Sequence, residues 1–203
     1  MQYRNKIAKE KVKRFKDQPY WGKPLAGFGD SKAQLLIIGL APAAHGGNRT
    51  GRMFTGDSSG DWLAKVLYDF GFANMPTSRN VDDGFKLNNA YITAAIRCAP
   101  PENKPTKDEM NSCSDYLESE LRILKNVKVI ICLGKIAFDS CCKLLGIRGI
   151  KFSHAKSFSH NEFEILCSYH PSRQNTQTGR LKWNQWSRVF FKAKKVLDEK
   201  VNE

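Results

Sequence analysis

Two stretches of the chain concentrate side chains that take part in acid–base and electrostatic catalysis. The first, residues 39–63 (GLAPAAHGGNRTGRMFTGDSSGDWL), contains His45, Asp57 and Asp61. The second, residues 168–181 (SYHPSRQNTQTGRL), contains His170 directly before a proline. A carboxylate can position water or stabilise a developing cation, and an imidazole can donate to a developing anion. These residue types predict a chemically active site if the fold brings the two stretches together.

Alternating strands and helices are the elements that would position these residues. Apolar runs predict buried strands at 34–40, 90–96, 127–133 and 164–168. Helical spacing predicts helices at 2–16, 61–70, 107–124, 136–145 and 180–195, and Thr106 with Glu109 predicts a capping box for the third. This alternation indicates an α/β fold with a parallel sheet covered on both faces. Ligands bind such sheets beyond the carboxyl ends of the strands, where both stretches fall.

Composition narrows the classes of protein and partner. The 203 residues include 33 Lys and Arg against 20 Asp and Glu, giving a net charge of +13. This excess favours a polyanion such as nucleic acid, although a solvated basic surface would give the same count. Neither a membrane span nor a secretory leader is predicted. We expect a single domain over residues 1–203, acting in the cytoplasm near the nucleoid as a monomer.

The two stretches, together with residues 91–106 (YITAAIRCAPPENKPT), resemble the motifs of the type-b, or family 5, uracil-DNA glycosylases. The resemblance runs from about residue 4 to residue 198, and the first motif is long and unusual. It implies a three-layer α/β/α fold around a four-stranded parallel sheet. It also implies excision of uracil and some other deaminated bases from double-stranded DNA, the first step of base excision repair.

Three residues are candidates for the central roles. The resemblance implies that Phe54 would stack on the extruded base and that Asp57 would position water and steady the sugar cation. His170 directly follows the last strand and precedes Pro171, and this position favours it as the donor to the base O2. Each residue has a plainer alternative as a structural group. Phe54 could be a core side chain under a loop. Asp61 competes with Asp57 for the carboxylate role, its own alternative being an N-cap or first-turn acid of the next helix.

Further contacts are implied around this centre. Ala41 would contact the base, and Asn175 would contact the base or the DNA backbone. His45 could contact the base or a phosphate, or could equally be a structural residue of its loop. Phosphate and groove contacts would come from a polar set: Asn48, Arg49, Ser58, Ser59, Arg173 and Gln174. Several related glycosylases read uracil with an Asn on the second strand, where this chain has Thr93-Ala94-Ala95. A pocket without that reader should select bases less strictly.

Cysteine usage leaves one question open. Cys132, Cys141, Cys142 and Cys167 lie in apolar segments typical of a core. Members of the resembled family hold a 4Fe–4S cluster with four Cys, and Cys98 and Cys113 match the later two in context. The earlier C-x-x-C would fall upstream of Met1. We expect either that a short segment carrying it precedes this sequence, or that the protein has given up the cluster.

Two other function classes fit parts of the pattern. Residues 172–178 (SRQNTQT) resemble the family's loop that enters the minor groove beside the flipped nucleotide. A catalytically inert DNA-binding protein on the same scaffold would keep the charge and this loop, but Phe54, Asp57 and His170 count against it. An unrelated doubly wound enzyme acting on nucleotides would need a fingerprint after the first strand, and GLAPAAHGG is not one.

Overall fold

The sheet at the centre of the fold has two more strands than the sequence predicts. The computed structural model describes residues 2–199. Its sheet order is β1-β3-β2-β4-β6-β5. The parallel centre contains β3 (Ala90–Ala94), β2 (Leu35–Gly39), β4 (Val129–Leu133) and β6 (Phe163–Ser168). These four strands are the ones expected from the apolar runs.

The two additional strands lie at the edges and run antiparallel. They are β1 (Phe28–Gly29), paired with β3, and β5 (Ser157–His160), paired with β6. The expected four-stranded parallel sheet is therefore corrected to a six-stranded mixed sheet. Both edge strands are short and only partly buried, so they carry no continuous apolar run to reveal them in the sequence.

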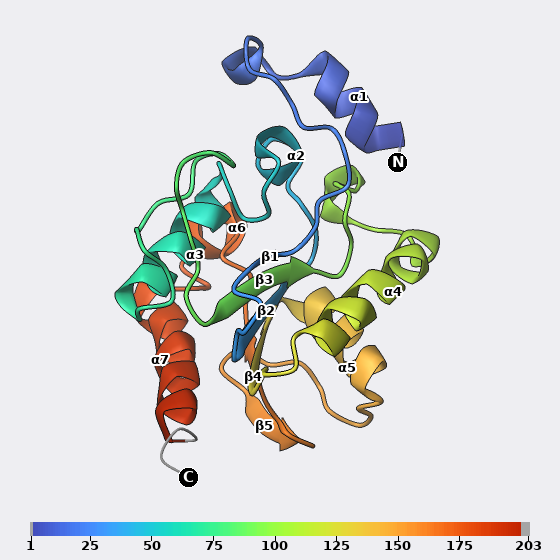
Figure 1. Ribbon diagram of the computed structural model, residues 1–203. Helices are drawn as coiled ribbons and strands as arrows, with labels where there is room; N and C mark the ends of the chain where they lie inside the picture. The colour runs from blue at the N-terminus through green and yellow to red at the C-terminus, as the bar shows by residue number, and fades with distance from the viewer. Residues whose placement is uncertain (1, 200–203) are drawn as a thin grey trace.

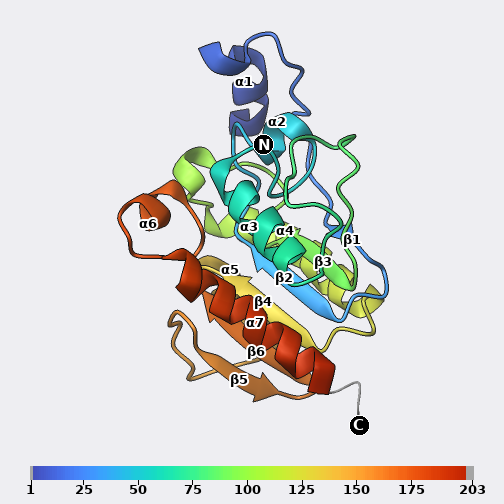
Figure 2. The same ribbon diagram turned by 90° about the vertical axis from the view of Figure 1, so that its left-hand side faces the viewer.

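Helices cover both faces of this sheet, giving the expected three layers (Figures 1 and 2). One face packs against α3 (Ser58–Asp69) and α7 (Trp183–Glu199), and the other against α4 (Lys107–Ile123) and α5 (Lys135–Leu145). Successive residues of β2 point to opposite faces: Leu35 and Ile37 join the first core, Leu36 and Ile38 the second. The capping box of Thr106 and Glu109 is present on α4.

The remaining short elements lie at the carboxyl ends of the strands. They are α2 (Gly47–Thr50), η2 (Pro101–Asn103) and α6 (Arg173–Gln177), all in segments expected to be loops. The single helix expected over 2–16 is instead α1 (Gln2–Glu10) followed by η1 (Lys13–Phe15). The helix stops because Lys11 adopts a positive φ of 50° and Val12 is extended. No helix among residues 2–199 is long and apolar enough to cross a membrane.

Candidate active site

One large cleft lies beyond the carboxyl ends of the parallel strands. Its volume is about 1570 Å³. It is lined by residues that follow β2, β4 and β6, so three strand ends meet in it. Ten of the residues expected at the site line this cleft: Ala41, His45, Arg49, Phe54, Asp57, Ser58, Ser59, His170, Arg173 and Gln174. The fold thus brings the two sequence stretches together, as expected.

Asp57 is held in place by the start of α3. It is the N-cap of that helix, and its Oδ1 accepts hydrogen bonds from the backbone N–H groups of Ser59 and Gly60, each at 2.9 Å. Burial raises the pKa of Asp57, while these two hydrogen bonds oppose the rise. Gly46 lies against the other oxygen, and a Cβ there would sit 2.0 Å from Oδ2. The carboxylate is therefore fixed, with little room to rotate.

Asp61, the competitor for the carboxylate role, lies in the first turn of α3, as its structural alternative requires. It is an exposed acid near the helix N-terminus. The N-cap position considered for Asp61 is taken by Asp57 itself. Both carboxylates still line the cleft, and burial raises the pKa of each.

Phe54 and His170 lie side by side in the wall of the cleft. Their ring centroids lie 5.7 Å apart, with the planes inclined by 31°. Phe54 lies over the end of β2, where a Cβ on Gly39 would come within 2.5 Å of its ring. Its backbone has a positive φ of 50°, which is uncommon for a non-glycine residue. The close fit at Gly39 fixes where the aromatic ring lies.

The imidazole of His170 is neutral at physiological pH. Burial lowers its pKa to about 4, and no charged group contributes to the shift. Gly134 directly follows β4, and a Cβ added to it would lie 3.6 Å from the Cβ of His170. A neutral imidazole carries one N–H donor, so His170 can donate to an anionic atom in the cleft without bringing a full charge.

His45 and Arg49 are engaged by other parts of the protein. The His45 Nδ1 lies 3.0 Å from the hydroxyl of Tyr20, and burial together with nearby Arg49 lowers the His45 pKa. The Arg49 guanidinium donates to the carbonyls of His45 and Gly56 and to Gln18, and it lies 4.0 Å above the ring of Phe15. Arg49 thus ties several loops together while it lines the cleft.

Two expected contacts, Asn48 and Asn175, do not line the cleft. Asn48 has no exposed surface, and its amide donates to the carbonyls of Arg4 and Ala44. The side chain of Asn48 therefore does not reach a phosphate in this conformation. Asn175, on α6, lines a smaller neighbouring cavity of about 390 Å³ and donates to the carbonyl of His170 at 2.8 Å.

The loop expected to enter a DNA groove is a short helix. Ser172 caps α6 by accepting from the Asn175 N–H, and Arg173 and Gln174 occupy its first turn, exposed along one rim of the cleft. On another wall, Ser58 is the first residue of α3. Ser58, Arg173 and Gln174 therefore all face the same cleft.

Some lining residues were missed by the sequence interpretation. The N-terminal segment contributes Tyr3, Val12, Arg14, Phe15, Gln18 and Pro19, and a later loop contributes Arg79, Asn80 and Asp82. Leu133, Gly134 and Lys135 follow β4 and also line the cleft. The strand-end rule could have found this last group, because residues 127–133 were already predicted to be a strand. The other two groups come from segments that do not follow a predicted strand.

The segment Thr93-Ala94-Ala95, where related glycosylases have a base-reading Asn, is buried. Thr93 of β3 is fully buried and donates through its hydroxyl to Glu120, which also pairs with Arg97. Ala94 and Ala95 that follow are buried and apolar. The Thr93 hydroxyl is therefore engaged in a hydrogen bond within the protein.

The expected metal ligands do not form a cluster site within residues 2–199. No group of three or more His, Cys, Asp and Glu side chains among these residues could hold a metal ion. The sulfur of Cys98 instead accepts from the guanidinium of Arg4 at 3.1 Å. A four-thiolate cluster needs two more sulfur donors beside Cys98 and Cys113. The described residues therefore do not fit the expected 4Fe–4S cluster.

Comparisons with known proteins agree closely with one another. A sequence profile described as the uracil DNA glycosylase superfamily matches residues 26–193. A type-5 uracil-DNA glycosylase of Thermus thermophilus is 44% identical over 189 residues, covering 90% of this chain and 84% of the relative. One of Mycobacterium leprae is 45% identical over 199 residues, covering 96% and 87%. A type-4 uracil-DNA glycosylase of Pyrobaculum aerophilum is 28% identical over 160 residues, covering 75% and 74%.

Proposed function

Because this chain belongs to the uracil DNA glycosylase superfamily, we propose that it excises uracil from double-stranded DNA as a type-5 enzyme. The observation that carries the proposal is the meeting of Asp57, Phe54 and His170 in one cleft. The relatives that share 41–45% identity over at least 90% of the chain all carry the type-5 name. The substrate is a duplex from which the damaged nucleotide has been extruded, since a stacked base cannot be attacked.

Phe54 provides the surface on which the extruded base stacks. Base–aromatic stacking contributes roughly 1–3 kcal/mol per base, which offsets part of the cost of unstacking the base from the duplex. The ring is already held in place by its fit against Gly39. Because the side chain is already ordered, little conformational entropy is lost when the base binds, and this loss does not offset the stacking energy.

Asp57 acts on the sugar side of the bond that breaks. As the N-glycosidic bond lengthens, positive charge develops on the sugar, and the fixed carboxylate stabilises it and orients the attacking water. Only the ionised form can do this. The raised pKa of Asp57 moves the acidic limit of activity upward from that of an ordinary carboxylic acid.

His170 acts on the departing base. Negative charge develops on the base as the bond breaks, and the neutral imidazole donates a hydrogen bond to it. Asn175 supports this role, because its amide donates to the carbonyl of His170 and fixes the backbone there. Asn175 is thus a positioning residue in the proposal, and Ala41 and His45 complete the wall around the base.

Base selection is proposed to be broad. Thr93 is committed to Glu120, and the residues that follow it are alanines, so no amide from this strand reads the uracil edge. A pocket without such a reader rejects hypoxanthine and substituted uracils less strongly. No step of this proposal is routed through an iron–sulfur cluster.

A duplex with a single U opposite G tests the function. Incubation followed by alkali should cleave the strand at the uracil, and the cleavage should be lost in Asp57→Ala. Binding without cleavage would support the inert DNA-binding alternative and refute the enzymatic proposal. The same assay with hypoxanthine and substituted uracils tests base selection, and strict confinement to uracil would refute broad selection.

A further inference from the structure

The N-terminal arm, defined here as residues 2–23, forms a rim of the cleft. It projects from the body of the fold as α1, η1 and the chain that leads back toward β1 (Figures 1 and 2). Arg14 and Phe15 of η1 line the cleft, together with Gln18 and Pro19 beyond them. The first turn of α6, with Arg173 and Gln174, lines the same cleft. The cleft therefore has exposed polar groups from the arm as well as from α6.

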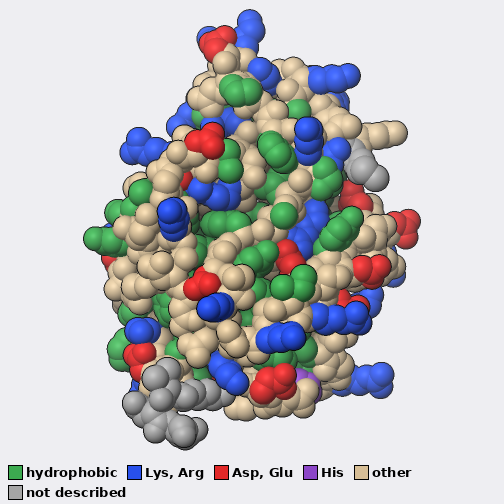
Figure 3. Space-filling model, in the orientation of Figure 1, with side chains coloured by type: hydrophobic (Ala, Val, Ile, Leu, Met, Phe, Trp, Pro, Cys, Tyr) green, Lys and Arg blue, Asp and Glu red, His purple; other side chains and the backbone are tan. Residues whose placement is uncertain are grey.

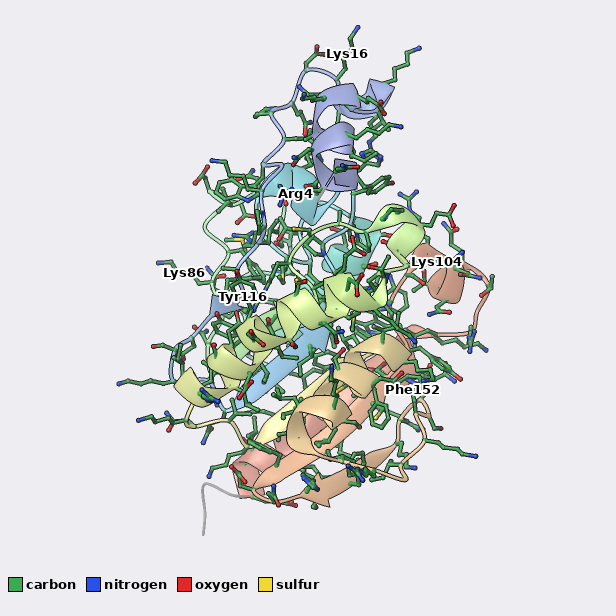
Figure 4. All side chains as sticks on the ribbon, turned by 90° about the vertical axis from the view of Figure 1, so that its right-hand side faces the viewer. Arg4, Lys16, Lys86, Lys104, Tyr116 and Phe152 are labelled. Carbon is green, nitrogen blue, oxygen red and sulfur yellow. The ribbon has the colours of Figure 1, made fainter. Side chains whose placement is uncertain are left out.

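The arm is fastened to the body at both of its ends. At the base of α1, Arg4 is buried, its guanidinium donates to Cys98, and its carbonyl accepts from Asn48 (Figure 4). At the far end, the backbone N–H groups of Trp21 and Gly22 donate to carbonyls of α2 at 3.0 and 3.1 Å. Such an arm holds its side chains at a fixed place relative to the catalytic groups, so little order is lost when a ligand binds.

The middle of the arm is tied to the catalytic loop. The ring of Phe15 packs under the guanidinium of Arg49, at 4.0 Å, and Arg14 lies over the same ring at 5.1 Å. Tyr20 is within hydrogen-bond distance of His45. These contacts place η1 directly beside the loop that leads to Asp57.

The arm is strongly basic on its exposed side. Its basic residues are Arg4, Lys6, Lys9, Lys11, Lys13, Arg14, Lys16 and Lys23, and its acidic residues are Glu10 and Asp17. Glu10 pairs with Lys6, a full turn back along α1. Lys13 and Arg14 are exposed, and none of the ion pairs found among residues 2–199 engages either of them. Figure 3 shows basic side chains gathered over this projecting end, and Lys16 extends from its tip in Figure 4.

We propose that the arm is a second phosphate-binding surface, on which Lys13 and Arg14 contact the DNA backbone beside the extruded nucleotide. This inference rests on the proposed function, because it takes the ligand of the cleft to be a duplex. Fixed cations at a cleft rim suit phosphates, whose spacing along the strand does not depend on sequence. The arm would add affinity and register without reading any base.

The test compares two double variants with the same loss of charge. Lys13→Gln/Arg14→Gln changes the arm. Lys32→Gln/Lys125→Gln changes exposed lysines that precede β2 and β4, at the end of the sheet opposite the cleft. Binding to an undamaged fluorescent duplex is measured by anisotropy over a range of salt concentrations. Thermal unfolding of each variant confirms that the fold is kept.

The arm variant should bind less tightly and depend less on salt. Loss of two phosphate contacts lowers the slope of log K against log salt by about 1.8. That slope corresponds to about 30-fold weaker binding at 0.15 M salt when the contacts contribute nothing at 1 M. The control pair should change both quantities far less, and Arg14→Lys should keep the wild-type slope.

Equal effects of the two double variants would overturn the proposal, because net charge alone would then account for the loss. An unchanged affinity in the arm variant would overturn it as well, and would leave the arm free for a partner other than DNA. The binding measurement does not depend on excision. A wild-type protein that binds through the arm but leaves uracil in place would refute the proposed function and retain this inference.

Discussion

Replacing Asp57 by asparagine separates the two roles of this side chain. The carboxylate caps α3 through two hydrogen bonds at 2.9 Å, and it also faces the cleft where the glycosidic bond would break. Asparagine caps a helix about as well as aspartate, because its carbonyl oxygen accepts the same bonds. It carries no charge, so it cannot stabilise a cation.

The expected magnitudes differ for two substitutions at this site. Asp57→Ala loses the cap, which costs about 1 kcal/mol and lowers Tm by roughly 2–4 °C in a protein of this size. Asp57→Asn should keep Tm near that of the wild type, since burial already opposes the charge. Excision should fall by about 10²–10⁴-fold in both, the range for a group acting at the reacting centre.

Single-turnover excision of uracil from a duplex, together with thermal unfolding, checks these values. Asp61→Asn is the matched control, because Asp61 lies one turn further along α3 and lines the same cleft without capping the helix. It should retain nearly full activity. Wild-type rates in Asp57→Asn would refute the catalytic role of the carboxylate and leave Asp57 as a helix cap alone.

Three further predictions follow from the geometry. Burial lowers the pKa of His170 from 6.5 to about 4, so the unfolding free energy should fall by up to about 3 kcal/mol as pH falls from 6.5 to 4. Denaturant titrations at several pH values should show a smaller fall in His170→Gln, and an equal fall would contradict the assignment. Gly46→Ala places a methyl group 2.0 Å from the Asp57 Oδ2, so excision should fall markedly while duplex binding is kept; full activity would mean that the carboxylate is free to move. Asp83→Asn breaks a buried ion pair with Arg52 and should lower the free energy of unfolding, measured with denaturant, by about 3–5 kcal/mol. Asp139→Asn breaks an exposed ion pair with Lys135 and should lower it by less than about 1 kcal/mol. Similar losses would show that burial does not set the difference.

Local sequence patterns were sufficient for the central layers of the fold. The four apolar runs correspond to the parallel strands because a strand buried on both faces needs apolar side chains on both sides. Thr106 and Glu109 are three residues apart, so their capping box depends on nothing outside one helical turn. The edge strands β1 and β5 were not predicted, because they form by pairing with β3 and β6 and have no apolar run of their own.

The site divides in the same way. Sequence placed Phe54, Asp57 and His170 after strands, and the parallel sheet necessarily brings strand ends to one edge. It could not show that Asn48 is buried under Arg4, or that Asp57 rather than Asp61 caps α3. Nor could it place η1 beside the cleft, because the arm is held there by Arg4, Trp21 and Gly22 through contacts with residues far along the chain.

The residue types and their order along the chain therefore determined which chemistry is available and at which edge of the sheet it lies. Tertiary structure alone decided which of those side chains face the cleft, which form hydrogen bonds within the protein, and which have shifted pKa values. The lowered pKa of His170 is an example, since it arises from burial by segments that no local pattern connects to that histidine.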